Sequence, residues 1–285
     1  MSAGSDTAPA YRVRGPGALS GGWRRFGYLV RTLAFTDWKL RFFGSVLGYL
    51  WSLLRPLMLF GILYVVFSQI VPVGEGVEAY PVLLLVGVIL YSYFAEVTGG
   101  AVSSMVDRET LVRKVSFPRM VVPLAVAVTA SFNLLLNLVV VAVFVAASGI
   151  EPRWTWLLLP LPLLLLVALA TGIAMLLSAL YVPFRDVRPI WEVGLQALFY
   201  GTPVIYPIEL LAERSQALAQ VAMSNPLAAL IQEARHLLLG PGTPSAADAI
   251  GGVGMLALPG GILVGAVLLG FVVFNRMAPY AAEQL

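Results

Sequence analysis

Long apolar runs separated by short charged segments make up most of the sequence. A helix of about 20 apolar residues is long enough to cross the hydrocarbon core of a bilayer. Six runs predict transmembrane helices, over residues 46–71, 81–104, 121–148, 157–181, 189–206 and 252–274. We therefore expect an all-α polytopic membrane protein in which residues 45–285 form one six-span domain. An even number of spans places both termini on the same side of the membrane.

Two polar segments precede the first run. Residues 1–22 are rich in Gly, Ser, Ala and Pro and predict a flexible leader. Residues 23–44 interleave aromatic and basic side chains, and most basic ones lie off the apolar face of a helical projection, which is typical of a helix in the membrane interface. Thr36 and Asp37 are placed to cap a second, shorter helix. The defining residues of the predicted interface helix are Trp23, Arg24, Arg25, Phe26 and Arg31.

A short basic segment, RETLVRKVSFPR, separates the second and third runs. Ser103 or Ser104 is placed to cap a short helix over residues 105–112, and Pro118 would end regular structure before the third span. A helix tied to two spans could transmit force from a soluble partner. A basic loop that only fixes topology would show the same composition, so both interpretations stay open.

The fifth run is interrupted at its outer end by Gly201, Pro203 and Pro207. Broken backbone at membrane depth is tolerated only where protein or a water-filled cavity surrounds it. In the polar stretch that follows, Asn225 is placed to cap a helix and Pro226 to begin it, with apolar residues at helical spacing afterwards. We expect two short outer helices over residues 208–240.

Composition and charge support a membrane protein and orient it. The 285 residues are 59% hydrophobic and 12% charged, whereas a soluble domain is about one-quarter charged. Of the 18 Lys and Arg residues, all but Arg153, Arg214 and Arg235 fall on the side of the two termini. The positive-inside bias therefore predicts that both termini and the basic segment are cytoplasmic. Lipid headgroups explain basic residues at the ends of apolar runs, so nucleic-acid binding is not expected.

Several kinds of active site are excluded by what the sequence lacks. The chain has no Cys, which removes disulfides and thiolate sites. Neither Lys39 nor Lys114 belongs to a phosphate-binding loop of the GxxxxGK[ST] type, so the chain cannot hydrolyse ATP by that route. His236 is the sole His, which excludes a zinc site built on a pair of His and disfavours a Ser-His-Asp triad. We expect no catalytic residue and no metal or cofactor in this chain.

Charged and aromatic residues within the runs are candidates for a transport path. Arg55, Glu96, Asp186 and Glu192 lie in or near spans, where an unpaired charge is costly. Their positions toward the cytoplasmic ends favour pairing among them over a role in ion coupling. Aromatic rings can pack a bundle or bind the apolar faces of sugars. The candidates for the path are Trp51, Tyr64, Phe67, Tyr91, Phe94, Phe199, Tyr200 and Tyr206.

Five motifs, covering the chain from about residue 20 onward, resemble one transporter family. RFFGSVLGYLWSLLRPL (41–57) has the family's pattern of an Arg, then Ser-x-Leu-Gly-x-x-Trp, then a Pro. It is followed in the family's order by LVRKVSFPRMVVP (111–123), FRDVRPI (184–190), PVIYP (203–207) and NPLAALIQEAR (225–235). The chain is thus similar to the permease subunits of ABC type-2 exporters of O-antigen, capsule and teichoic acid. It departs from that pattern at Arg55, where a neutral residue is expected, and at Arg108, where Asn is commoner.

This resemblance implies a half-transporter in the inner membrane of a bacterium. Two copies of the chain would form the path for a lipid-linked glycan, and two separate nucleotide-binding ATPase subunits would hold ATP and Mg²⁺. It assigns residues 23–36 to an interface helix, 105–112 to a coupling helix and 208–240 to an outer gate. The residues implied in ATPase coupling are Arg108, Glu109, Leu111, Arg113, Lys114, Phe117, Pro118, Arg119, Arg185 and Asp186, and those implied in the gate are Asn225, Pro226 and Arg235.

Other functions remain open. An exporter of the same fold could carry a drug or a small lipid, and its cavity would need fewer aromatic residues in spans one and five. An ion-coupled secondary carrier would stop when the proton or sodium gradient is collapsed and would need no nucleotide-binding subunit. A membrane-bound glycan enzyme is disfavoured because paired acids and metal ligands are missing.

Overall fold

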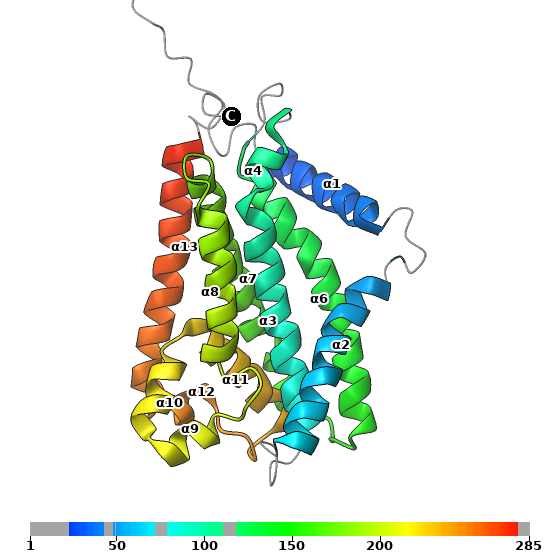
Figure 1. The fold of residues 1–285 in the computed structure, drawn as a ribbon, viewed down its shortest axis with the longest axis vertical. Coiled ribbons are helices and arrows are strands. Elements are labelled where there is room, and N and C mark those ends of the chain that lie inside the picture. The colour runs from blue at the N-terminus through cyan, green and yellow to red at the C-terminus, as the bar shows by residue number, and fades with distance from the viewer. Residues whose placement is uncertain (1–22, 43–47, 49, 72–78, 111–117, 279–285) are drawn as a thin grey trace, which may run out of the picture.

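The structure is a computed structural model that describes residues 23–42, 48, 50–71, 79–110 and 118–278. All regular elements of these residues are helical (Figure 1). The α-helices are α1 (Trp23–Phe42), α2 (Leu50–Val65), α3 (Tyr80–Val102), α4 (Ser104–Asp107), α6 (Val121–Ala147), α7 (Pro160–Tyr181), α8 (Val187–Gly201), α9 (Glu209–Arg214), α10 (Gln216–Met223), α11 (Pro226–Leu239), α12 (Ala246–Ile250) and α13 (Ala257–Met277). Three short elements are the π-helix η1 (Val66–Ile70) and the 3-10 helices η2 (Trp154–Leu158) and η3 (Val253–Leu256).

Five helical segments among the described residues are long and apolar enough to cross a membrane. They match five of the six predicted spans and are Leu50–Ile70, Tyr80–Val102, Val121–Ala147, Trp154–Tyr181 and Val253–Met277. The sixth prediction, residues 189–206, coincides with α8, which has 15 residues and is therefore only about 22 Å long. The helix ends at Gly201, and Thr202 is extended, so the backbone breaks where the sequence predicts it.

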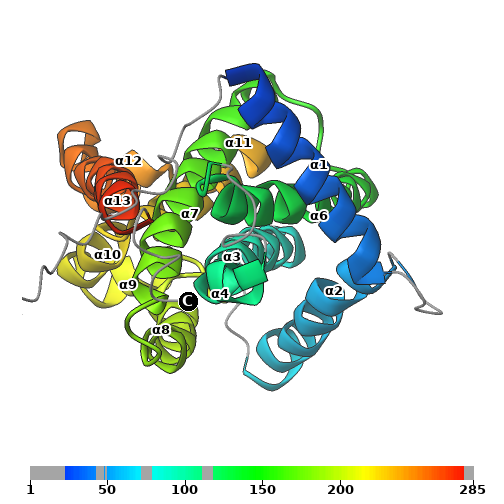
Figure 2. The same ribbon diagram turned by 90° about the horizontal axis from the view of Figure 1, so that it is seen from above.

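Helix α3 is the centre of the bundle (Figure 2) and contacts α2, α6, α7, α8 and α11. In its most apolar segment 78% of the residues are buried, compared with 11% in the segment that begins with α2. Apolar residues surround α3 on all sides, and Leu84 and Val88 are fully buried. The two segments have similar mean hydropathy, 1.8 and 1.9, and lipid can cover an apolar helix as well as protein can, so the difference in burial reflects the contacts of α3 with five other helices.

Glycines allow α7 and α13 to pack closely. A Cβ atom at Gly172 would lie 2.7 Å from the Cα atom of Val267, and one at Gly270 would overlap the carbonyl oxygen of Gly172. Small residues at such crossings let two membrane helices approach until their backbones touch, which is a main source of helix association in lipid.

The two ends of the bundle differ (Figure 1). Helices α1 and α4 and the C-terminal end of α13 lie at one end, whereas α9, α10, α11 and α12 form a small cluster at the other. Residues 208–240 were predicted to form two short helices and form three, α9, α10 and α11, because the chain turns at Ser215 as well as before Asn225. Helix α1 runs unbroken through Thr36 and Asp37, so the prediction that these residues cap a second helix is wrong. Asp37 instead pairs with Arg108, which leaves its carboxylate unavailable as a cap.

Substitution of Gly270 by Ala should destabilise the bundle by about 1–3 kcal/mol, because the added methyl group forces α7 and α13 apart. Gly265→Ala on the same helix is the matched control, since a Cβ atom there meets nothing within 4 Å. Thermal unfolding in detergent measures the difference. Equal melting temperatures for the two variants would contradict the close helix contact.

Candidate functional site

A cavity of about 930 Å³ opens between α2, α3, α6 and α8, with Arg41 of α1 at its wall. Its lining combines aromatic rings with hydroxyl, amide and charged groups. The polar and charged lining residues are Arg41, Ser52, Arg55, Ser92, Glu96, Asn133, Asn137 and Gln196. A cavity of this size, with a mainly apolar wall that includes several polar and charged groups, is the main candidate for a ligand site among the described residues.

Four of the eight predicted path aromatics line this cavity. Trp51 and Tyr200 are 46% and 67% exposed, and their rings present apolar surface to it. Phe199 packs edge-on against Tyr91, with ring centroids 5.0 Å apart, and lies 5.3 Å from Tyr200. The Tyr91 hydroxyl donates a hydrogen bond to the carbonyl of Leu195 in α8, so it also holds α8 against α3.

The other four predicted aromatics do not line the cavity. Phe94 is buried in the core beside Trp191. Tyr64 stacks on Phe60, with 5.8 Å between ring centroids, and Phe67 packs against the same core cluster. The Tyr206 hydroxyl donates to the carbonyl of Tyr200 over 3.2 Å. Their contacts are those of packing residues in this conformation.

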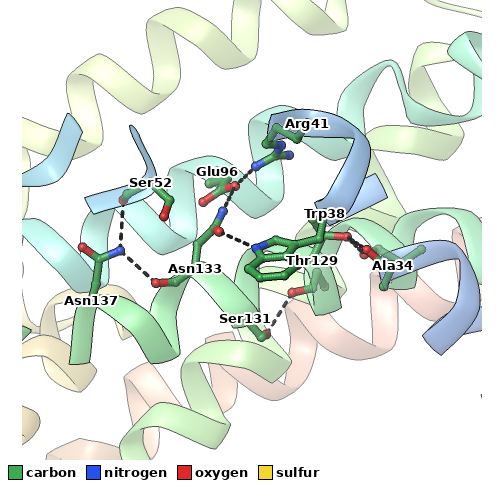
Figure 3. Close-up of polar contacts among 11 residues, drawn as sticks. Ala34, Trp38, Arg41, Ser52, Glu96, Thr129, Ser131, Asn133 and Asn137 are labelled. Atoms are coloured by element: carbon green, nitrogen blue, oxygen red, sulfur yellow. Dashed lines mark hydrogen bonds and ion pairs between the residues drawn. The ribbon is translucent and has the colours of Figure 1, made fainter. Parts of the chain in front are cut away.

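A polar network joins three helices at the cavity wall (Figure 3). Glu96 of α3 pairs with Arg41 of α1 and accepts a 2.8 Å hydrogen bond from the Asn133 amide of α6. The Asn133 carbonyl oxygen in turn accepts a 3.1 Å bond from the Trp38 indole of α1. The network explains why a carboxylate can lie in an apolar run, since Glu96 has a cationic partner and a neutral donor.

The same network contains residues that sequence reasoning missed. Thr129, Asn133 and Asn137 follow one another every fourth position on α6 and are at most 6% exposed. Thr129 donates to the carbonyl of Ala34 in α1 over 3.1 Å. Three polar residues at helical spacing in an apolar run mark a stripe that faces protein rather than lipid, and this signal was present in the sequence.

Asn137 is unusual because half of its amide group is unpaired. Its amide nitrogen donates to the carbonyls of Ser52 and Asn133 over 3.2 Å and 2.8 Å. Its oxygen is buried without a hydrogen-bond partner among the described residues. Rotating the amide by 180° would direct that oxygen at two carbonyl oxygens, so the orientation is fixed. This acceptor lies behind the surface of the cavity wall, where leaving it unpaired is unfavourable.

At the end where α1 and α4 lie, Asp37 of α1 forms an ion pair with Arg108, directly after α4. Helix α4 spans Ser104–Asp107, Arg108 forms a turn, and Glu109 and Thr110 are helical again. Most of the described part of the predicted coupling helix is therefore helical. Arg185 and Asp186 are exposed, and the guanidinium of Arg185 lies 5.0 Å from the centre of the Tyr181 ring. The remaining predicted coupling residues lie outside the described residues and are Leu111, Arg113, Lys114 and Phe117.

Pro118 and Arg119 are buried, unlike the exposed coupling surface expected for them. Arg119 is 3% exposed and donates to the carbonyl of Ala278 at the end of α13. Its charge therefore serves to join the start of α6 to α13, because the last carbonyls of a helix attract a cation. In this conformation neither residue offers a surface to a partner.

Helix α1 lies along the bundle instead of standing free. Phe26 packs against the cluster formed by α6, α7 and α13, and Ala34 is fully buried. Trp23 is 80% exposed, and Arg24, Arg25 and Arg31 are exposed as well. The apolar face predicted from the sequence thus packs partly on protein, while the basic face stays free.

The predicted gate residues hold the outer cluster to α3. Asn225 caps α11 by accepting a 3.0 Å bond from the backbone of Leu227, and Pro226 begins the helix, both as predicted. Arg235 is fully buried and donates to three carbonyls, those of Leu83, Pro203 and Val204, over 3.0, 2.5 and 2.6 Å. One guanidinium therefore joins α11, the broken segment after α8, and α3.

The burial of Arg235 changes the pKa of its guanidinium and requires space in the neighbouring helix α3. Burial lowers the pKa of its guanidinium to about 9, and the nearby Glu209 opposes this shift. The group remains charged at neutral pH, so its three carbonyl acceptors compensate for lost water. Gly87 of α3 makes room for it, because a Cβ atom there would overlap the guanidinium and lie 2.6 Å from the carbonyl oxygen of Val204.

Comparison with known proteins gives consistent matches. The ABC-2 type transporter family model matches residues 28–239. An O-antigen export system permease protein RfbA of Myxococcus xanthus is 31% identical over 203 residues, which are 71% of this chain and 77% of that protein. Two proteins of the same name from Klebsiella pneumoniae are 29% and 28% identical over 204 and 250 residues. The alignment over 250 residues covers 87% of this chain and 92% of that relative.

Replacing Arg235 with Gln should loosen the outer cluster. The variant cannot reach three carbonyls, and each buried acceptor left unpaired costs about 1–3 kcal/mol. We expect faster trypsin cleavage after Arg214, which is exposed on α9, and a lower melting temperature. Arg276→Gln, at an exposed position on α13, is the control. Cleavage at the rate of the unsubstituted protein would show that Arg235 does not hold the cluster.

Proposed function

The chain belongs to the ABC-2 type transporter family, and from this premise we propose that it is the transmembrane subunit of an ATP-driven exporter of a polysaccharide or lipid-linked glycan. It is a multi-pass protein of the bacterial inner membrane. The named relatives are permeases of O-antigen export, which supports a glycan as the cargo. The family implies an ATPase partner, which would hold ATP and Mg²⁺.

We further propose six spans, with α8 as the fifth, and both termini in the cytoplasm. The basic residues support this orientation, because the end of the bundle with α1 and α4 is the end rich in Arg and Lys. In the proposed assembly two copies of the chain stand side by side, and two ATPase subunits bind below α1 and α4. The cluster of α9 to α12 then faces outward, and residues 208–240, which contain α9, α10 and α11, act as the gate.

The observation that carries the proposal is the cavity of about 930 Å³. Sugars present apolar C–H faces ringed by hydroxyl groups. Trp51 and Tyr200 supply exposed aromatic faces, and the amide of Gln196, which is exposed and lines the same cavity, can form hydrogen bonds with sugar hydroxyls. A cavity for an apolar drug would not need these acceptors and donors.

The contacts of α1 suggest how force would reach the cavity. An ATPase that presses on the segment after α4 would move α1 as well, because Arg108 and Asp37 are paired. Helix α1 is in turn bound to the cavity wall through Arg41 and Glu96. Helix α1 and the segment after α4, which are both expected to contact the ATPase, would therefore move α3 and α6 together.

The proposal is tested by reconstituting the chain with its ATPase in liposomes and following lipid-linked glycan. We expect transport that requires ATP and both subunits. Collapse of the proton and sodium gradients should leave the rate unchanged. Transport by the chain alone, or transport that stops when a gradient is collapsed, would favour a secondary carrier instead.

Tyr200→Ala should slow glycan export about fivefold to tenfold, because an aromatic contact is worth about 1 kcal/mol. Tyr200 is preferred to Phe199, which also packs on Tyr91 and would disturb the fold. Phe271→Ala on α13 is the matched control, as Phe271 is exposed outside the cavity. Export is measured at saturating ATP. If Tyr200→Ala exports glycan as fast as the control variant, the ring of Tyr200 does not contact the glycan.

Exchange of charges tests the link between α1 and the segment after α4. Asp37→Arg and Arg108→Asp should each lower the glycan exported per ATP hydrolysed, and the double exchange should restore much of it, with an interaction energy of about 1–2 kcal/mol. Arg188 and Glu192 form a control pair, because their 3.1 Å ion pair lies within α8. Single variants with normal coupling, or a double variant no better than the singles, would contradict the lever.

A further inference from the structure

The cavity has more positive than negative charge in its wall. Arg41 and Arg55 line it, and Glu96 is the acid among the described lining residues. Glu96 is already engaged, because its carboxylate pairs with Arg41 and accepts from Asn133. One positive charge of the lining is therefore left without a counter-ion.

Arg55 carries that excess charge. Its side chain is exposed, and the ion pairs found among the described residues do not include it. Arg55 lies in the second turn of α2, within an apolar segment long enough to cross a membrane. A cation within an apolar run is unfavourable unless an anion or water-filled space accompanies it.

The face of α2 that lines the cavity describes the ligand further. Trp51, Arg55 and Leu59 follow at intervals of four residues and all line the cavity. Such residues lie above one another on one face of a helix. A molecule along this face would meet an aromatic ring, a guanidinium and an aliphatic side chain in turn. That sequence of surfaces fits an amphiphile with a compact anionic group next to an apolar chain.

We propose that Arg55, assisted by Arg41, binds the phosphate group of a lipid amphiphile in this cavity. The planar guanidinium can donate two parallel hydrogen bonds to phosphate oxygens. Among the described residues no carboxylate forms an ion pair with Arg55. Arg41 can take part without leaving Glu96, because a guanidinium has five N–H donors and the pair with Glu96 leaves others available. Trp51 then covers the group adjoining the phosphate, and Leu59 contacts the apolar chain.

The phosphate can come from two sources. If the proposed function is correct, it is the phosphate that joins the exported glycan to its lipid carrier, and Arg55 is part of cargo recognition. The same guanidinium chemistry would hold the phosphate of an anionic phospholipid from the bilayer. A binding experiment can distinguish the two sources without any transport.

The experiment measures equilibrium binding of radiolabelled farnesyl pyrophosphate to the full chain, with its ATPase, in nanodiscs of phosphatidylcholine. Binding to empty nanodiscs is subtracted. We expect saturable binding that Arg55→Gln weakens about tenfold or more, the loss of one charge-assisted contact. Arg41→Gln should weaken it as well, and Arg55→Lys should retain part of it. Arg188→Gln is the control, because Arg188 is exposed on α8 outside the cavity.

A second arm replaces part of the phosphatidylcholine by phosphatidylglycerol. If the bilayer lipid is the natural source, it will raise the apparent Kd for farnesyl pyrophosphate in the unsubstituted protein but not in Arg55→Gln. If the carrier lipid is the source, the Kd will stay the same. Both results support the phosphate site.

Three results would overturn the proposal. They are absence of saturable binding, an equal Kd for Arg55→Gln and the unsubstituted protein, and binding of farnesol as tight as that of farnesyl pyrophosphate. An unchanged melting temperature of Arg55→Gln shows that the variant is folded. The proposed exporter function is tested independently of this phosphate site, because it is measured as ATP-dependent glycan export by the unsubstituted complex.

Discussion

Inside a bilayer no water is available to satisfy a polar group, and this constraint decides where the polar side chains of this transporter lie. Glu96 is stable in an apolar helix because Arg41 and Asn133 reach it from two other helices. Arg235 is stable in the outer cluster because three backbone carbonyls surround it. In each case the partners come from different elements, so satisfying one polar group fixes several helices relative to one another. The polar residues thus determine the arrangement, while apolar burial provides the general attraction.

Both polar centres meet on α3. Toward one end of this helix Glu96 binds α1 and α6, and toward the other the carbonyl of Leu83 accepts from Arg235. The cavity lies along the same helix, with Ile89, Tyr91 and Ser92 in its wall. Because most of α3 is buried against other helices, we expect it to move together with its neighbours. In the proposed mechanism, motion of α1 would therefore change the cavity and the contact with the outer cluster together.

Sequence patterns predicted this structure best where one local rule applies. Five spans followed from length and hydropathy, and the start of α11 followed from the Asn-Pro cap. The cavity could not be predicted in this way, because it depends on which faces of four helices meet. The weak periodicity of apolar residues in α3 does not show which helix packs on which face. That is why Phe94 was expected in the path and lies in the core. Arg119 shows the same limit, because the resemblance implies a role in ATPase coupling, whereas the side chain is buried and donates to the carbonyl of Ala278.

Helix α2 forms a wall of the cavity that this chain covers only partly. Its apolar segment is 11% buried, and the helix continues as the π-turn η1, a geometry often found at functional sites. Helix α2 packs on α3 and α6 but leaves Met58, Ile62 and Val65 exposed. Its remaining surface must be covered by lipid or by another polypeptide. The shape of the cavity is therefore set partly by what lies against α2, and in the proposed assembly of two copies, pairing along α2 would enclose the ligand site from its open side.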